Sequence, residues 1–311
     1  MDPEYIGTIL RCIKENFTVS SQAEITLETN PGTVDKEKFK GFFEAGINRI
    51  SIGIQSFDDN ELKFLTRIHS SRQAEETVFC AYDSGFNNIN LDLIFNLPAQ
   101  SRELWQNNME RAISLPVKHI SAYSLILEPG TILNKMVLDN KISMQGNEID
   151  AELYECTIDT LERHGFSQYE VSNFAQKGYE CVHNNTYWRH GEYIGFGTSA
   201  HSFMDKKRWW NFRSLSFYQK AVDEKQNAVA GAESLTKQQL TEEFVMLALR
   251  SSGLSLKELA EKYGTEWYEL NKKEINLLKS EKFVEAAEDV LKLTKKGRLL
   301  CDEILTRFNL P

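Results

Sequence analysis

The chain has 311 residues, of which 41% are hydrophobic and 26% charged, and it carries a net charge of −9 at pH 7. This length accommodates one large domain and a small one, and the acidic balance excludes general charge attraction to nucleic acid or anionic membranes. The sequence has no run of about 18 apolar residues, and its first residues lack the basic and apolar segments of a signal peptide. We therefore expect a cytoplasmic protein that is not an integral membrane protein.

The first part of the chain alternates between predicted helices and strands. Apolar periodicity predicts a helix over residues 3–15, a strand over 24–28 and a helix over 35–45. Asn-Pro-Gly at 30–32 is a strong turn signal, which places Glu28 where a strand becomes a loop.

The stretch over residues 50–67 combines a strand with a polar end. Isoleucine at every second position predicts a buried strand, and Gln55 follows at its carboxyl end. Ser56 or Asp58 can cap a short helix that ends near Arg67. Strand ends and the following loops line one face of a barrel, so Gln55 and Arg67 can face one pocket. The same pattern also fits a capped helix with a surface arginine.

A helix over 71–84 and a strand that starts near residue 88 come next, and Asp92 lies inside this strand. An acid in so apolar a strand is costly unless it is paired or faces a polar cavity. Asp92 is therefore the most informative carboxylate in the chain. The alternative is an acid at a strand edge that is satisfied by backbone amides.

The alternation continues with a helix over 101–114, a strand over 119–127, a helix over 147–164 and a strand over 167–171. Helices that alternate with strands indicate parallel strands joined by right-handed crossovers. The expected fold is therefore α/β, a TIM-like (βα) barrel or part of one.

The rhythm changes after residue 172. The segment 181–203 contains three of the six histidines and the pair Gly195 and Gly197. A Gly-x-Gly spacing lets a backbone approach a ligand closely, although it is weak evidence alone. His183 and Tyr187 are four residues apart and would share a helical face. An imidazole and a phenolate could ligate haem iron, but a histidine taken singly is more often structural.

The last part of the chain reads as a small helical domain. A polar stretch at 225–235 marks a predicted boundary, which gives domains over 1–228, with an accessory segment at about 172–228, and over 229–311. The second domain is winged-helix-like, with a short predicted wing and four predicted helices, over 236–250, 255–263, 265–280 and 294–308. Residues 235–311 carry 13 Lys and Arg against 13 Asp and Glu, so packing or partner docking is favoured over nucleic-acid binding.

Several segments together resemble a known family. They are Ile-Thr-Leu-Glu-Thr-Asn-Pro-Gly-Thr (25–33), Arg-Ile-Ser-Ile-Gly-Ile-Gln-Ser-Phe (49–57), Asn-Leu-Asp-Leu-Ile-Phe-Asn-Leu-Pro (90–98) and His-Ile-Ser-Ala-Tyr-Ser-Leu (119–125). They are similar to the radical S-adenosylmethionine (SAM) proteins of the oxygen-independent coproporphyrinogen III oxidase-like family. His-Asn-Asn-Thr-Tyr-Trp (183–188) with Gly-Phe-Gly-Thr-Ser-Ala-His-Ser (195–202) resembles the haem chaperone (HemW) branch. The resemblance covers essentially the whole chain.

The resemblance implies SAM and haem as cofactors. Glu28 matches the acid that holds one SAM, and Gln55, Arg67 and Asp92 match polar contacts to a second SAM. A guanidinium can pair with the methionine carboxylate in two hydrogen bonds.

The haem element of the family matches His183 and Tyr187, with His183 as a candidate iron ligand, and His201 lies close to the same site. The implied function is a haem chaperone that delivers haem to acceptor proteins. The alternative is oxygen-independent coproporphyrinogen III oxidase (dehydrogenase) in porphyrin biosynthesis, and a remnant barrel that retains only the fold is a third possibility. The His-Asn-x-x-Tyr-Trp element favours the chaperone.

The sequence departs from the family at the iron–sulfur motif. The family's Cys-x3-Cys-x2-Cys loop, which binds a [4Fe–4S] cluster, has no counterpart among Cys12, Cys80, Cys156, Cys181 and Cys301. Scattered cysteines are typical of reduced thiols. We therefore expect an N-terminally truncated barrel without cluster ligands or catalytic residues, inactive in SAM cleavage. The strand at 24–28 would then form an exposed edge and favour self-association.

Overall fold

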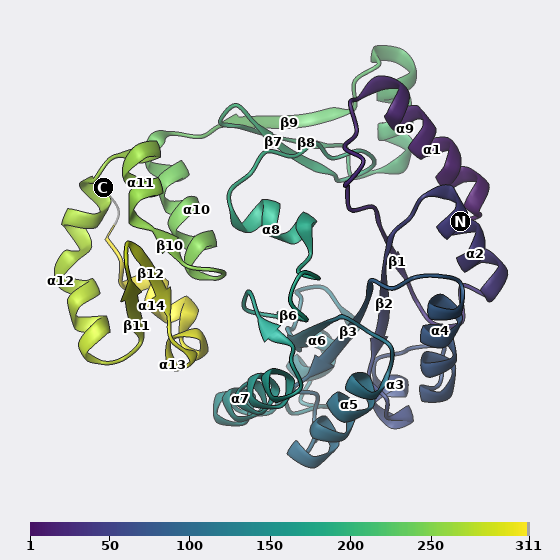
Figure 1. Ribbon diagram of the computed structural model, residues 1–311, viewed down its shortest axis with the longest axis horizontal. Coiled ribbons are helices and arrows are strands. Elements are labelled where there is room, and N and C mark those ends of the chain that lie inside the picture. Colours follow the sequence, from purple (N-terminus) through teal and green to yellow (C-terminus); the bar gives the residue numbers. More distant parts are fainter. Residues whose placement is uncertain (310–311) are drawn as a thin grey trace. The chain divides into compact units, whose positions relative to one another are not determined.

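The computed structural model describes residues 1–309 and contains two compact units, Met1–Glu180 and Cys181–Pro311 (Figure 1). The domain limits 1–228 and 229–311, which were drawn from composition, stay a prediction.

The first unit is built on a six-stranded sheet with the order β1-β2-β3-β4-β6-β5. Its strands are β1 (Thr26–Thr29), β2 (Arg49–Gln55), β3 (Ile89–Phe95), β4 (His119–Ser124), β5 (Ser167–Gln168) and β6 (Asn173–Ala175). The first four strands are parallel, as predicted. The strand expected at 167–171 is present as β5 and runs in the same direction as β1 to β4, but it pairs with an intervening antiparallel strand, β6, and not with a parallel neighbour. The few residues between β5 and β6 are too few for a crossover connection.

Helices α2, α4, α5 and α7 lie along one side of this sheet (Figure 1). The helices of the unit are α1 (Pro3–Asn16), α2 (Lys36–Ala45), α3 (Asp59–Phe64), α4 (Ser71–Asp83), α5 (Arg102–Ser114), α6 (Ile132–Leu138) and α7 (Asn147–Arg163). Asp58, rather than Ser56, caps α3 by accepting hydrogen bonds from the Asn60 and Glu61 amides. Helix α6 was not predicted, and it contains no buried residue.

The two faces of the sheet differ in chemistry. Ile50, Ile52 and Ile54 of β2 are fully buried in the core with the helices. Because side chains alternate along a strand, Ser51 of β2 and Asp92 of β3 point to the opposite face. The sheet is therefore apolar where the helices cover it and polar on the other face, which is the face that carries the candidate site.

The second unit begins with α8 (Val182–Trp188) and an antiparallel sheet with the order β7-β8-β9. Its strands are β7 (His201–Met204), β8 (Lys207–Asn211) and β9 (Val229–Ser234), and α9 (Leu215–Lys225) connects the last two. The polar stretch at 225–235, which was predicted to mark a domain boundary, contains strand β9. Gly231 lies opposite Trp210 on the paired strand, and a Cβ there would lie 2.5 Å from the Trp210 indole.

The remainder of the second unit forms a winged-helix-like module. It contains α10 (Lys237–Leu249), α11 (Leu256–Tyr263), α12 (Glu266–Ser280), α13 (Lys295–Leu299) and α14 (Cys301–Arg307), with β10 (Leu254–Ser255), β11 (Val284–Ala287) and β12 (Val290–Leu293). The predicted wing is confirmed, since β11 and β12 pair antiparallel. The single helix predicted over 294–308 is interrupted at Leu300, whose backbone (φ −114°, ψ 26°) is not helical.

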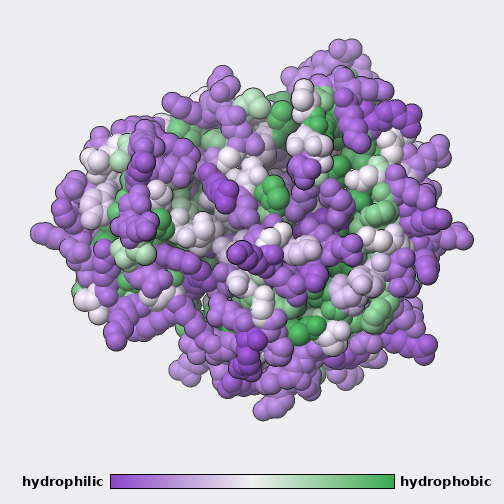
Figure 2. All heavy atoms as spheres, viewed as in Figure 1, coloured by the Kyte–Doolittle hydropathy of each residue, from purple (hydrophilic) through white to green (hydrophobic). Residues whose placement is uncertain are grey.

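Hydrophilic residues cover most of the face drawn in Figure 2, and apolar residues form separate small groups between them. Within residues 1–309, none of the helices has the length and apolar character needed to cross a membrane.

Candidate functional site

The polar face of β2, β3 and β4 carries a connected set of hydrogen bonds. The Asp92 carboxylate accepts from Ser51 Oγ at 3.0 Å and from Asn90 Nδ2 at 2.8 Å. The Asn90 amide oxygen in turn accepts from His119 Nδ1 at 2.5 Å and from Ser121 Oγ at 3.1 Å. Asp92 thus lies on a central strand and is held by side chains, so the alternative of an edge acid satisfied by backbone amides is wrong.

His119 completes this network as a neutral imidazole. Because its Nδ1 donates to an amide oxygen, its Nε2 accepts from the Tyr169 hydroxyl at 2.8 Å. Burial lowers the pKa of His119 well below its usual value, and the charge of Arg49 acts in the same direction. A neutral, fully bonded His119 therefore helps to fix the Asp92 carboxylate in one orientation.

Gln55 is the last residue of β2, and Arg67 contacts Asn30 in the loop after the neighbouring strand β1. Gln55 is buried and has a left-handed backbone (φ 70°), a conformation that is strained for this residue. Arg67 Nη1 lies 3.4 Å from Asn30 Oδ1, while its buried Nε has no hydrogen-bond partner among the described residues. A Cβ at Gly53 would lie 2.8 Å from both Asn30 Oδ1 and Gln55 Nε2, so glycine leaves the room that these side chains occupy. Asn30 and Gly53 were not predicted, since Asn-Pro-Gly was interpreted only as a turn.

Glu28 is an exposed residue of β1, directly opposite Ser51 of β2. Ser51 also contacts Asp92, so these two acids flank one serine on the polar face. The structure therefore brings all four predicted residues to neighbouring strands and loops of one sheet, where an arginine and two acids can hold a ligand that carries both charges.

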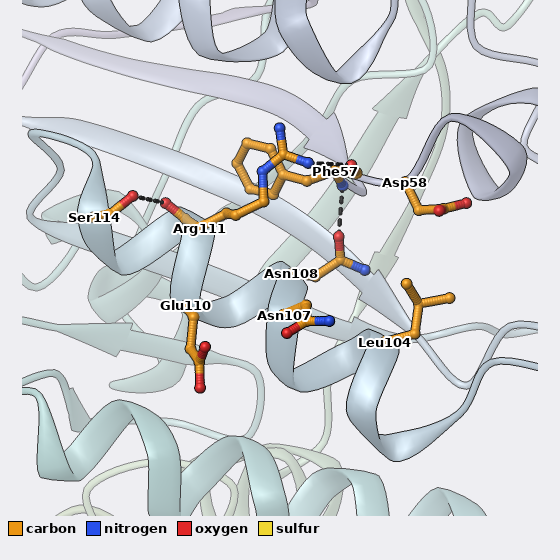
Figure 3. A pocket seen from close by; sticks show the side chains of 8 residues that line it. All are labelled: Phe57, Asp58, Leu104, Asn107, Asn108, Glu110, Arg111 and Ser114. Carbon is orange, nitrogen blue, oxygen red and sulfur yellow. Dashed lines mark hydrogen bonds between the residues drawn. The ribbon is translucent and has the colours of Figure 1, made fainter.

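A separate pocket of about 500 Å³ lies between the turn after β2 and α5 (Figure 3). Its polar groups face one another: Arg111 Nη1 donates to the Phe57 carbonyl at 2.6 Å, and the Phe57 amide donates to Asn108 Oδ1 at 2.6 Å. Arg111 also pairs with Glu75 at 2.7 Å. Because these groups are hydrogen-bonded to one another, we infer that they hold the turn after β2 in place and that this pocket is not a ligand site.

The buried carboxylate of Glu61 also holds this turn in place. Glu61 accepts from Ser56 Oγ at 2.5 Å, from Asn108 Nδ2 at 2.9 Å and from Gln100 Nε2 at 2.8 Å. These donors come from the turn after β2, from α5 and from the loop after β3. Glu61 therefore joins the two loops that follow the strands carrying Gln55 and Asp92.

In the second unit, α8 carries His183 and Tyr187 on one face, as predicted. Their ring centroids are 4.8 Å apart in an edge-to-face arrangement, and Tyr187 also contacts Tyr193 at 4.5 Å. Burial raises the pKa of Tyr187, and Tyr193 adds to this shift. Tyr187 is therefore a protonated phenol at neutral pH, which leaves the imidazole of His183 as the readier donor to a metal.

His201 is an exposed residue of β7 with a defined tautomer. Its Nδ1 donates to the Ser199 carbonyl at 3.0 Å, so the neutral ring presents Nε2 as an acceptor. Metal-binding histidines commonly have this arrangement. Gly195 lies beside it, and a Cβ there would lie 2.2 Å from the His201 carbonyl oxygen, which explains one glycine of the Gly-x-Gly pair.

The five cysteines are scattered along the chain, and the absence of an iron–sulfur cluster stays a prediction. Cys156, Cys181 and Cys301 are buried in different elements, and burial raises the pKa of Cys301 to about 11. Over residues 1–309, no group of three or more His, Cys, Asp or Glu side chains is arranged to hold a metal ion.

Comparison with known proteins identifies the chain. Residues 1–112 match the radical SAM superfamily, and residues 235–300 match the HemN C-terminal domain. The fold is similar to the solved structure of coproporphyrinogen III oxidase (HemN) from Escherichia coli, with a TM-score of 0.82 and 22% identity over 98% of this chain and 74% of that one. Fold and domains thus define a radical SAM protein with a HemN-type C-terminal domain.

The curated relatives specify the family further. Heme chaperone HemW of Bacillus subtilis is 35% identical over 290 residues, which is 93% of this chain and 76% of that protein. The HemW proteins of Lactococcus lactis and Mycobacterium tuberculosis H37Rv are 30% and 32% identical over 309 and 303 residues, covering 99% and 97% of this chain and 81% and 76% of theirs. The chain belongs to the heme chaperone HemW family. The predicted family and branch are confirmed, whereas the roles of individual site residues stay predictions.

Proposed function

We propose that this chain binds haem through the segment 181–203 and delivers it to haem-accepting proteins. The observation that carries the proposal is the shared face of His183 and Tyr187 on α8, with centroids 4.8 Å apart, in a member of the HemW family. His201 supports it, because its Nε2 is available as an acceptor. The coproporphyrinogen III oxidase alternative is weaker, since the likeness to the E. coli enzyme at 22% identity concerns the fold alone.

Different residues of the segment 181–203 are assigned different roles in haem binding. Bound haem would supply an iron that accepts an imidazole nitrogen as a ligand. We assign that nitrogen to His183, while the protonated phenol of Tyr187 packs edge-on against the imidazole and limits its rotation. His201 is assigned to the same ligand, either to the iron or to a propionate.

We further propose that the polar face of the first unit binds SAM, with Glu28 at one SAM and with Gln55, Arg67 and Asp92 at a second. SAM carries a carboxylate, an ammonium and ribose hydroxyls, and when bound it supplies a sulfonium centre. The buried, unpartnered Nε of Arg67 fits the carboxylate. Glu28 and Asp92 fit the ammonium and the hydroxyls.

A ferric haem titration followed in the Soret region tests the proposed function. We expect saturable one-to-one binding that weakens at least about tenfold, or ~1.4 kcal/mol, in His183→Ala. The control is His164→Ala, which removes an exposed histidine at the end of α7. Absence of binding, or equal weakening by both substitutions, would contradict the proposal. Decarboxylation of coproporphyrinogen III by this chain would favour the enzyme instead.

A further inference from the structure

His190, the residue after the C-cap of α8, has an unusual conformation. His190 has a left-handed backbone (φ 54°), its amide bonds to the Tyr187 carbonyl at 2.9 Å, and the Gly191 amide bonds to the Thr186 carbonyl at 2.8 Å. Glycine or asparagine is the usual residue at this position of a helix end, because other side chains are strained there. A histidine at this position indicates that its side chain has a use that offsets the strain.

The His190 imidazole is buried between elements of the C-terminal module and the sheet. Only 6% of its side chain is exposed, and it stacks on Phe203 of β7 with centroids 4.8 Å apart. Its Nδ1 lies 3.3 Å from the Tyr263 hydroxyl on α11. Its Nε2 lies 3.3 Å from Glu243 Oε2 on α10, yet outside hydrogen-bond geometry, so this buried nitrogen has no hydrogen bond within residues 1–309.

The same Glu243 oxygen is shared with a second cation. Arg208 Nη2 on β8 donates to Glu243 Oε2 at 2.7 Å, and Arg208 Nη1 donates to Glu233 on β9 at 3.1 Å. The charged and titratable groups that face His190 are therefore Glu243 from α10, Lys262 and Tyr263 from α11, and Arg208 from β8. A protonated His190 would compete with Arg208 for one oxygen.

We propose that His190 is a positioning residue that ties α8 to α10 and α11, so that the C-terminal module orients His183 and Tyr187 and makes haem retention depend on pH. This inference rests on the proposed haem site. Only Trp188 and Arg189 lie between Tyr187 and His190, and the hydrogen bonds of the helix end connect His190 directly to the last turn of α8. In this proposal the C-terminal winged-helix-like module influences haem binding without contacting haem.

The direction in which haem binding changes with pH follows from the fact that His190 is neutral in the folded protein. Burial lowers the pKa of His190 below 6.5, against the opposing attraction of Glu243. The arrangement described above is therefore fully present above pH 6.5 and is lost as the pH falls towards the lowered pKa. Haem affinity is therefore expected to decrease as the pH falls below 6.5 towards the lowered pKa of His190.

Haem titrations at a series of pH values test the inference with two substitutions. His190→Phe keeps a ring that can stack on Phe203 but loses the contact with Tyr263 and cannot be protonated, so it should bind haem more weakly than the wild type in mild alkali and lose less affinity in acid. Any acid loss common to both proteins belongs to other groups. His190→Asn tolerates the left-handed backbone but lacks the ring, and we expect about fivefold to tenfold weaker binding at every pH, which corresponds to ~1–1.4 kcal/mol.

The two carboxylates of Arg208 provide a matched pair. Glu243→Gln removes the charge that faces His190, whereas Glu233→Gln removes the other partner of Arg208 and leaves His190 untouched. Only the first substitution should change the pH profile of haem binding. Identical profiles for the two variants would overturn the inference.

Hydrogen exchange of the α8 amides, measured without haem, gives an independent readout. His190→Asn and Glu243→Gln should increase exchange in α8, while Glu233→Gln should not. Unchanged exchange together with wild-type haem binding in all variants would overturn the inference. If the wild type fails to bind haem but α8 exchange responds as described, the proposed function fails and the positioning role stands.

Discussion

At the scale of single residues, the most consequential side chain outside the ligand positions is Glu61. Its buried carboxylate accepts three hydrogen bonds from side chains on three different segments. Glu61→Ala leaves Ser56, Gln100 and Asn108 without this acceptor, and buried donors that lose a partner are costly. We expect the free energy of unfolding to fall by about 2–4 kcal/mol in urea denaturation.

Glu110→Ala is the matched control for this measurement, because Glu110 is an exposed acid on α5 that lines the pocket between α5 and the turn after β2. It should change the unfolding free energy by no more than about 0.5 kcal/mol. Comparable losses in the two variants would show that the Glu61 network does not hold the loops together.

Individual residues also show where sequence reasoning succeeds. Asp92 and Gln55 could be selected because a polar group within or at the end of an apolar strand demands an explanation. Asn30 and His119 could not, since their importance depends on Arg67 and Asn90, which are distant in sequence. His190 was passed over for the same reason, because its neighbours Glu243 and Tyr263 belong to a part of the chain assigned to another domain.

At the scale of elements, β2 combines a buried apolar face with a glycine that the candidate SAM site requires. Gly53→Ala would place a Cβ 2.8 Å from Asn30 Oδ1 and Gln55 Nε2, so both side chains must move. We expect SAM affinity, measured by calorimetric titration, to fall about tenfold, or ~1.4 kcal/mol. Gly7→Ala in α1 is the control, because a Cβ there meets only Ala45 at 4.0 Å. Undiminished SAM binding by Gly53→Ala would place the ligand elsewhere.

Elements with a periodic apolar face were predictable, and those without one were not. Helices α2, α4 and α5 have buried residues at helical spacing. Helix α6 has no buried residue, and β9 is mostly exposed, so neither produces such a pattern. The antiparallel strand β6, which follows β5 after a short turn, was not predicted because the alternation of helices and strands in the preceding units concealed it.

At the scale of the whole molecule, β1 forms one edge of the six-stranded sheet. Edge strands present unpaired backbone groups that can pair with another chain. We expect concentration-dependent self-association through β1, visible as a rising mean mass in light scattering and insensitive to added salt, because backbone pairing is not ionic. A uniform monomer at high protein concentration would contradict this expectation.

The opposite chemistry of the two sheet faces has a consequence for the evolution of this protein. The isoleucines that face the helices carry the packing, whereas Ser51, Asn90 and Asp92 on the other face contribute little apolar burial. Substitutions on the polar face leave the apolar core intact, but Ser51 and Asn90 are buried and hydrogen-bonded, so a single change there leaves a buried partner unsatisfied. A lineage built on this sheet can therefore change its small-molecule specificity at low cost only by exchanging the members of this network together.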